Sequence, residues 1–269
     1  MNNRERFKFG KNWKHFLSVL NNGRINEAQL SLQEMLQVEN LQDKTFLDIG
    51  SGSGLFSLCA ARLGALKVHS FDFDQQSVAC TAELKRRYFD NSQNWIVESG
   101  SVLDAGYLSK LGQWDVVYSW GVLHHTGAMW QALENTAMLV RKGGKLYIAI
   151  YNKQKFMTPV WTKIKKAYVK SNVLFRFLIL VFFIFYFILR GLLMDLATLR
   201  NPLKRYTQYA RQRGMHMFYD WIDWIGGYPF EAVKPEEIFD FFRKRGFILD
   251  KLKTQFGSSG CNEFVFHKG

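Results

Sequence analysis

Strand-like and helix-like segments alternate through the middle of the chain, and this alternation constrains the fold more than any other feature. The strand-like segments are short and apolar, and they occupy residues 45–50, 67–73, 94–102, 114–120 and 145–152. Helical patterns lie between them at 53–64, 75–89 and 129–140. Regular alternation of this kind predicts an α/β fold with a parallel sheet covered on both faces. Ligands of such sheets bind at the carboxyl ends of the strands.

A glycine-rich turn, "LDIGSGSGLF", follows the first of these strands. Gly50, Gly52 and Gly54 permit a sharp turn and a close approach to a ligand. A dinucleotide fingerprint would require glycine where Leu55 stands, and a phosphate-binding loop would require a Gly-Lys-Ser/Thr sequence that does not occur here. Asp48, just before the turn, would repel a pyrophosphate but suits a ligand that carries an ammonium and a sulfonium.

Five motifs in order give the chain a resemblance to a known family. They are "LDIGSGSG", "SFDFD", "ESGSVLD", "WDVVYSWGVLHHT" and "LVRKGGKLYIAIYN", the last with a glycine pair before the fifth strand, and together they cover about residues 44–152. This series resembles the class I S-adenosylmethionine-dependent methyltransferases, and specifically the small-molecule branch related to ubiquinone-pathway O-methyltransferases. The resemblance implies a Rossmann-like, seven-stranded sheet, mostly parallel with the last strand antiparallel. It also implies S-adenosylmethionine as cofactor and S-adenosylhomocysteine as product.

The resemblance assigns roles to individual residues. Asp72, at the end of the second strand, would bind both ribose hydroxyls, and Phe73 would lie against the adenine. Asp74 would cap the next helix, and Ser101 stands where the family usually has aspartate. The full set of cofactor-binding residues implied in this way is Asp48, Gly50, Ser51, Gly52, Gly54, Asp72, Phe73, Ser101, Val102 and Trp120.

Two adjacent histidines after the fourth strand are the leading candidates for a general base. Methyl transfer requires mainly alignment of the partners and exclusion of water, and an oxygen nucleophile benefits from a base whose pKa lies near the working pH. His124 or His125 fits this role, and His216 is the next candidate. The same pair also fits a polar pair at a helix start. No metal site is expected, because adjacent histidines rarely converge on one ion and no acidic pattern accompanies them.

The expected organisation has four parts: an N-terminal helical cap at 1–40, the cofactor-binding core at 41–152, an insertion at 153–227, and the last part of the core sheet at 228–269. The cap reads as two helices joined at "NNG", with Asn26 as N-cap of the second. The C-terminal part reads as a helix followed by an antiparallel strand pair. The aromatic segment "FYDWIDWIGGYPFE" fits either a lid over the acceptor or a packing seam between insertion and core.

The basic charge is concentrated around one apolar run. Of the 36 Lys and Arg, 16 lie between residues 141 and 215 against the single acid Asp195, a net charge of +15, whereas the remaining 20 basic and 22 acidic residues give −2. This segment contains "FLILVFFIFYFIL", thirteen residues that span about 20 Å as a helix, short of a bilayer core of about 30 Å. Extension to a spanning length would include Arg176 and Arg190. A span and a buried core helix stay open, and an anchor in one leaflet, with basic flanks on anionic headgroups, is favoured.

The predicted function is therefore methyl transfer to a hydroxyl of a small, lipophilic or lipid-linked acceptor. We expect the enzyme in the cytoplasm, peripheral on the cytoplasmic face of an anionic membrane, because the N-terminus is too polar for a secretory signal and Cys59, Cys80 and Cys261 are scattered. The alternative is an RNA methyltransferase whose basic insertion binds phosphates. The apolar run and the absence of an Asn-Pro-Pro-Tyr-type motif after the fourth strand argue against nucleic acid. A homodimer is left open.

Overall fold

The computed structural model describes residues 10–90, 92–202, 204, 217–258 and 260–269. The chain divides into two compact units. The core unit comprises Lys8–Thr158 and Phe230–Gly269, and the helical unit includes Pro159–Pro229, where the insertion is expected at 153–227. Each unit is described by itself.

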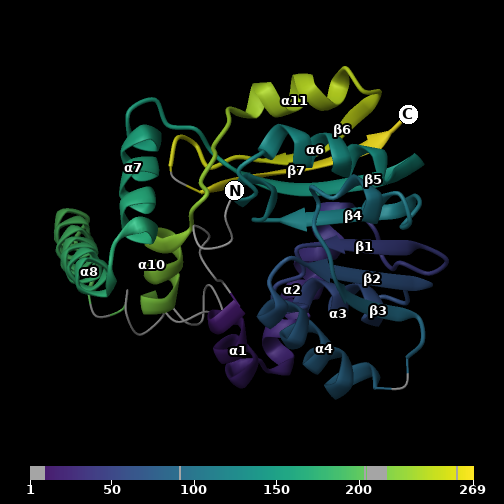
Figure 1. The fold of residues 1–269 in the computed structure, drawn as a ribbon, viewed down its shortest axis with the longest axis horizontal. Coiled ribbons are helices and arrows are strands. Elements are labelled where there is room, and N and C mark those ends of the chain that lie inside the picture. Colours follow the sequence, from purple (N-terminus) through teal and green to yellow (C-terminus); the bar gives the residue numbers. More distant parts are fainter. Residues whose placement is uncertain (1–9, 91, 203, 205–216, 259) are drawn as a thin grey trace. The chain divides into compact units, whose positions relative to one another are not determined.

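Within the described residues, the core unit contains a sheet of seven strands in the order β3-β2-β1-β4-β5-β7-β6 (Figure 1). Neighbours from β3 to β5 are parallel, and β7 is antiparallel to both β5 and β6, which confirms the predicted fold class. The order reverses between β1 and β4, and ligands of such sheets bind at this reversal. The strands are β1 Thr45–Ile49, β2 Lys67–Asp72, β3 Trp95–Ser99, β4 Trp114–Trp120, β5 Val140–Tyr151, β6 Phe247–Lys253 and β7 Cys261–Lys268.

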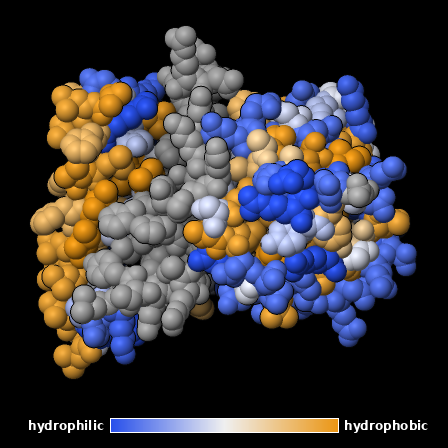
Figure 2. Space-filling view, turned by 90° about the horizontal axis from the view of Figure 1, so that it is seen from below, coloured by the Kyte–Doolittle hydropathy of each residue, from blue (hydrophilic) through white to orange (hydrophobic). Residues whose placement is uncertain are grey.

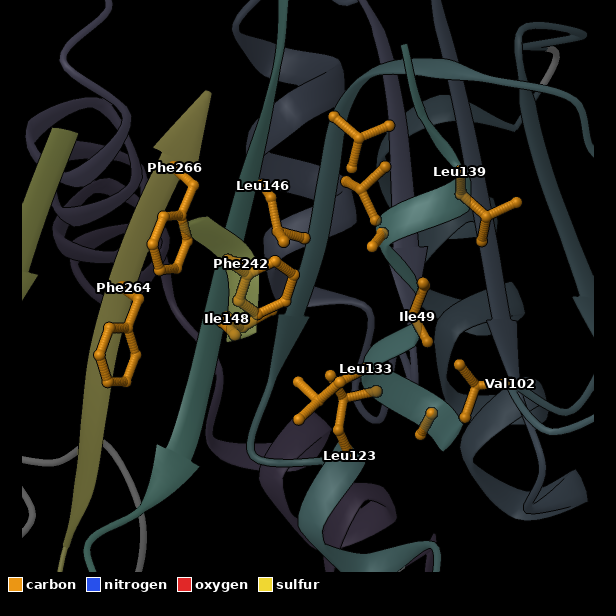
Figure 3. Packing of buried hydrophobic residues seen from close by; sticks show 14 of the residues in the cluster. Ile49, Val102, Leu123, Leu133, Leu139, Leu146, Ile148, Phe242, Phe264 and Phe266 are labelled. Atoms are coloured by element: carbon orange, nitrogen blue, oxygen red, sulfur yellow. The ribbon is translucent and has the colours of Figure 1, made fainter. Parts of the chain in front are cut away.

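Helices cover both faces of this sheet. Successive strand residues point to opposite faces, and apolar side chains on each face form a buried cluster with the helices. Leu146 and Ile148 of β5 face one buried cluster and Tyr147 faces another. In the first cluster, Figure 3 shows Phe264 and Phe266 of β7 beside β5. The helices of the core unit are α1 Gly10–Val19, α2 Asn22–Leu36, α3 Leu55–Arg62, α4 Gln75–Phe89, α5 Ala105–Leu108, α6 Met129–Met138 and α11 Pro235–Arg243.

Two boundaries differ from the sequence-based expectation. The Asn21 side chain accepts a hydrogen bond from the Arg24 amide at 3.0 Å and α2 begins at Asn22, so Asn26 as N-cap is wrong. The earlier start extends the helix through the "NNG" segment, because the cap satisfies a first-turn amide. Strand β5 begins at Val140, so the glycine pair lies inside the strand, close to an irregularity in its pairing with β4.

The chain enters and leaves the insertion at one place in the core unit. Asn152 and Val233 form an isolated parallel bridge just beyond β5. The Val233 amide donates to the Tyr151 carbonyl at 3.0 Å, and the Lys153 amide donates to the Val233 carbonyl at 3.1 Å. The two ends of the insertion are therefore fixed side by side.

The helical unit contains α7 Met157–Lys170, most of which lies in this unit, α8 Val173–Ala197 and α10 Met217–Gly226. The Trp161 ring of α7 lies 5.6 Å from Phe183 and 5.5 Å from Trp224, measured between ring centroids. The Trp221 ring lies 5.4 Å from Phe187. Trp221 and Trp224 of α10 thus pack on helices of the same unit, and the expectation of a lid or a seam stays a prediction.

Candidate functional site

The glycine-rich turn joins the ends of β1 and β2. The Gly50 and Ser51 amides both donate to the Phe71 carbonyl, at 2.8 and 3.1 Å. Gly50, Gly52 and Gly54 have φ of +77°, +55° and +80°, which favour glycine. A Cβ on Gly50 would also lie 2.5 Å from the Val122 side chain. The loop therefore requires glycine for its backbone conformation and for its packing.

Asp72 lies at the end of β2 with its carboxylate against this loop, as the sequence predicts. Oδ2 accepts from the Gly52 amide at 3.0 Å, and Oδ1 accepts from the Asp74 amide at 2.8 Å. Burial raises the pKa of Asp72 to about 6, although these amides act to lower it. The adjacent Phe73 side chain is 47% exposed, and Asp74 caps α4 by accepting from the Gln76 amide. The half-buried carboxylate of Asp72 thus lies beside the exposed ring of Phe73 and the backbone of Gly52.

Asp48 and Ser51 point into the domain. The Ser57 hydroxyl of α3 donates to Oδ2 of Asp48, which is 2% exposed. Burial, with a smaller contribution from the Asp72 charge, raises the pKa of Asp48 to about 7. The Ser51 hydroxyl lies 2.9 Å from the Thr81 hydroxyl of α4. Both residues support the loop from within, and contact with a cofactor stays a prediction for them.

Three further residues that are expected to bind the cofactor are divided between surface and core. The half-buried Ser101 accepts from the Leu103 amide at 3.2 Å. The Val102 side chain is 6% exposed and belongs to the core cluster (Figure 3), and its carbonyl accepts from Asn135 Nδ2 at 2.7 Å. Trp120, the last residue of β4, is 45% exposed. Of these residues, Ser101 and Trp120 present side-chain surface to a ligand.

The two histidines of the pair occupy different environments on a 3₁₀ turn, Leu123–His125. His124 is fully buried, and its Nδ1 accepts from the Tyr151 amide at 3.3 Å. A neutral imidazole has one lone-pair nitrogen, and this hydrogen bond assigns it to Nδ1 in His124. His125 is half-buried, with its ring edge-on to Tyr151 at 5.5 Å. His125 is therefore the member of the pair that a substrate can contact, and His216 lies outside the described residues.

Glu231 holds the histidine turn in place, and sequence reasoning missed it. Its amide donates to the His124 carbonyl at 3.0 Å, and Oε2 accepts from the Met129 amide at 3.1 Å. This carboxylate caps α6, whose N-cap residue Ala128 has no capping side chain. Burial raises the pKa of Glu231. No local signal could have found this contact, because 102 residues separate the partners.

Trp13 is a second residue that the sequence did not single out. The Gly10 amide at the start of α1 donates to Oδ2 of Asp74 at 3.2 Å. A Cβ on Gly52 would lie 3.0 Å from the indole of Trp13, so this ring packs directly on the glycine-rich loop. Helix α1 therefore covers the loop from the side of α4. Among the described residues, no cluster of three or more His, Cys, Asp or Glu could hold a metal ion.

A family model described as a methyltransferase domain matches residues 47–146. The chain is 37% identical over 71 residues to a ribosomal protein L11 methyltransferase of Methylococcus capsulatus (26% of this chain, 24% of the relative). It is 31% identical over 110 residues to a tRNA U34 carboxymethyltransferase of Actinobacillus succinogenes (40% and 32%). It is 33% identical over 122 residues to a ubiquinone biosynthesis O-methyltransferase of Parvibaculum lavamentivorans (43% and 44%). The matches thus span less than half the length of these relatives, whose names indicate different acceptors.

The fold also resembles solved structures. A magnesium protoporphyrin IX methyltransferase from Synechocystis, crystallised with bound S-adenosylhomocysteine, superposes with a TM-score of 0.55 at 14% identity. The match covers 92% of this chain and 84% of that one. At this identity the likeness concerns the fold alone.

Proposed function

Because this chain belongs to the class I S-adenosylmethionine-dependent methyltransferases, we propose that it transfers a methyl group to a hydroxyl of a small lipophilic acceptor. The cofactor is S-adenosylmethionine, which supplies an electrophilic methyl group on its sulfonium when bound. Binding of the cofactor and the acceptor, and removal of the acceptor proton, come from side chains and backbone at the carboxyl ends of β1, β2, β4 and β5.

The loop and the end of β2 fit an adenosine. The Asp72 carboxylate accepts backbone hydrogen bonds from Gly52 and Asp74, and an ionised carboxylate has about four acceptor positions, so it can also accept from ribose hydroxyls. The Phe73 ring is exposed beside them and can lie against a purine. Asp48 lies just before the loop, and because its pKa is raised to about 7 it supplies a negative charge above that pH. These acceptor carboxylates and the exposed ring support the assignment of the cofactor to this edge of the sheet.

The half-buried imidazole of His125 is the observation that carries the choice of a hydroxyl acceptor. An imidazole takes a proton near neutral pH, as deprotonation of a hydroxyl during methyl transfer requires. His124 positions it, since the buried ring lies 4.5 Å from His125 and is bonded to the backbone of β5. Aromatic rings lie beside the turn: Tyr151 is 5.5 Å from His125 and 5.1 Å from the buried Phe230, measured between ring centroids. A flat, apolar acceptor with one hydroxyl suits this environment.

An RNA acceptor is the second candidate. It is supported by the likeness to a tRNA-modifying relative and by the net charge of +15 between residues 141 and 215. Basic surface alone binds phosphates without choosing a methylated atom. The lipophilic acceptor is preferred because aromatic side chains and a general base meet at His125.

Transfer of a labelled methyl group into defined fractions tests this proposal. The purified chain would be incubated with methyl-labelled S-adenosylmethionine and, separately, with lipid extract, total RNA and ribosomal protein. We expect label in the lipid fraction as an alkali-stable methyl ether. His125→Ala should lower the rate by about a hundredfold with cofactor affinity unchanged, as loss of a general base does. Label confined to RNA or protein, or an alkali-labile methyl ester, would refute the proposal.

A further inference from the structure

Helix α8 exposes a continuous apolar surface along its whole length. By length and composition this helix could cross a membrane, and only Gly191 and Asp195 of its 25 residues are buried. Figure 2 shows this helix as the orange surface at the left. Six side chains at helical spacing, between 42% and 64% exposed, define what we call the outer stripe: Phe175, Leu178, Phe182, Phe185, Leu189 and Leu196. Exposed apolar surface of this extent on a soluble protein indicates a binding face.

The opposite side of α8 is occupied by the helical unit itself. Phe183 and Phe187 pack on Trp161 of α7, with ring centroids 5.6 and 6.3 Å apart. Arg176 donates from Nε to the Tyr168 carbonyl at 3.1 Å and from a second nitrogen to the Val169 carbonyl. This arginine therefore caps the C-terminus of α7 and is not part of the outer stripe.

The charged side chains around α8 are basic. Lys163, Lys166 and Lys170 of α7 are exposed, as is Arg190 of α8. Arg200 and Lys204 follow α8 and are also exposed. Among the described residues from 157 to 204, Asp195 is the one acid, and it is 4% exposed. The surface of this segment is thus apolar and cationic.

We propose that the outer stripe lies in one leaflet of an anionic membrane, with α8 parallel to the membrane surface. Its 25 residues are about 37 Å long, enough to cross a bilayer by length alone. However, Phe183 lies ten residues after Val173, about 15 Å along the helix, and there it contacts Trp161 of α7. A perpendicular α8 would carry α7, with Lys163 and Lys166, to the centre of the hydrocarbon, where cations are costly.

A parallel helix removes this conflict. The outer stripe enters the acyl region, while α7 remains on the aqueous side with its lysines among the headgroups. A second copy of the chain is a poorer occupant, because pairing two such segments brings like charges together without compensating acids. Anionic lipid supplies both the apolar phase and the opposite charge. The inference concerns the helical unit and does not depend on methyl transfer.

Vesicle flotation tests the stripe. The full chain should float with vesicles of phosphatidylglycerol and phosphatidylcholine, and much less with phosphatidylcholine alone. Replacing Phe182→Glu together with Phe185→Glu should lower the bound fraction at least tenfold. The matched control is Phe256→Glu, which alters a 97% exposed phenylalanine in the core unit and should float as the unaltered chain does. Calorimetry with S-adenosylhomocysteine shows that each variant keeps a folded core. Full flotation of the doubly substituted chain, or none of the unaltered chain, would overturn the proposal.

Labelling from one side of sealed vesicles tests the orientation. Val173→Cys and Leu199→Cys place thiols at exposed positions at the two ends of α8, and the chain's own Cys59, Cys80 and Cys261 are buried, so background is low. A membrane-impermeant maleimide added outside should label both positions of the bound protein equally. Protection of one position until detergent is added would show a span.

The oligomeric state in buffer tests the other occupant. A second copy lies on the outer stripe if the unaltered chain does not bind vesicles and forms a dimer that is lost in the Phe182→Glu, Phe185→Glu chain. Either a span or a second copy would overturn the proposal.

Discussion

Asp72 should make cofactor binding depend on pH, because its pKa is raised to about 6 when no ligand is bound. We expect ribose hydroxyls to donate to the ionised carboxylate, so protonation of Asp72 should weaken cofactor binding. Affinity is therefore fully present above pH 6 and is lost as the pH falls through that value. For a ligand that binds only the ionised form, the apparent dissociation constant scales as 1 + 10^(pKa − pH). Between pH 7 and pH 5 this factor grows about tenfold, which corresponds to about 1.4 kcal/mol.

Titration calorimetry with S-adenosylhomocysteine measures this dependence without the sulfonium charge of the methyl donor. Asp72→Asn should bind about tenfold more weakly at pH 7, since it loses charge-assisted hydrogen bonds, and should show little change towards pH 5. The two curves should converge at acid pH. Asp74→Asn is the matched control, because asparagine can still cap α4 and the Asp72 carboxylate is kept. This control should retain a decline at acid pH, with its midpoint moved below pH 6, because the Asp74 charge contributes to the raised pKa of Asp72.

Two results would refute this reasoning. Equal affinity of the unaltered chain at pH 5 and pH 7 would mean that the Asp72 carboxylate does not contact the cofactor. A decline that persists in Asp72→Asn with a midpoint near pH 7 would identify Asp48 as the titrating group, because its pKa is raised to about 7.

Two further changes are informative. Trp13→Ala should weaken S-adenosylhomocysteine binding several-fold in calorimetry at pH 7, because the indole packs on Gly52 and covers the loop. Unchanged affinity would show that α1 does not contribute to the site. Phe266 is fully buried between the sheet and its helices. Phe266→Ala should lower the free energy of unfolding of the core unit, measured in urea, by about 3–5 kcal/mol. A loss below about 1 kcal/mol would contradict the packing described.

The strands and the cofactor loop could be predicted because their signals are local. The glycines at positive φ lie in the turn that needs them, and Asp72 is recognisable as the acid that ends the apolar strand β2. The start of α2 was less certain, since asparagines at several neighbouring positions can cap a helix and the choice depends on which turn is buried. Asn21 supplies the cap in the structure.

The acceptor side of the site could not be predicted in the same way. The sequence makes His124 and His125 equivalent neighbours, whereas in the structure His124 is fully buried and bonded to the backbone of β5, and His125 is half-buried. Glu231 reaches the same turn from beyond the insertion, and Trp13 reaches Gly52 from the N-terminal helix. Such contacts join distant parts of the chain, so no periodicity or spacing in the sequence predicts them.

The bridge between Asn152 and Val233 makes the insertion an exchangeable module. Because hydrogen bonds in the core fix the two ends side by side, the geometry of the sheet does not depend on the number of residues between them. Doubling the length of such a loop costs only about 0.6 kcal/mol in closure entropy. A lineage could therefore replace the helical unit by a shorter, longer or wholly soluble segment and keep the same catalytic domain. With α8 bound to a membrane as we propose, a change in the location of the enzyme would then require no change in its chemistry.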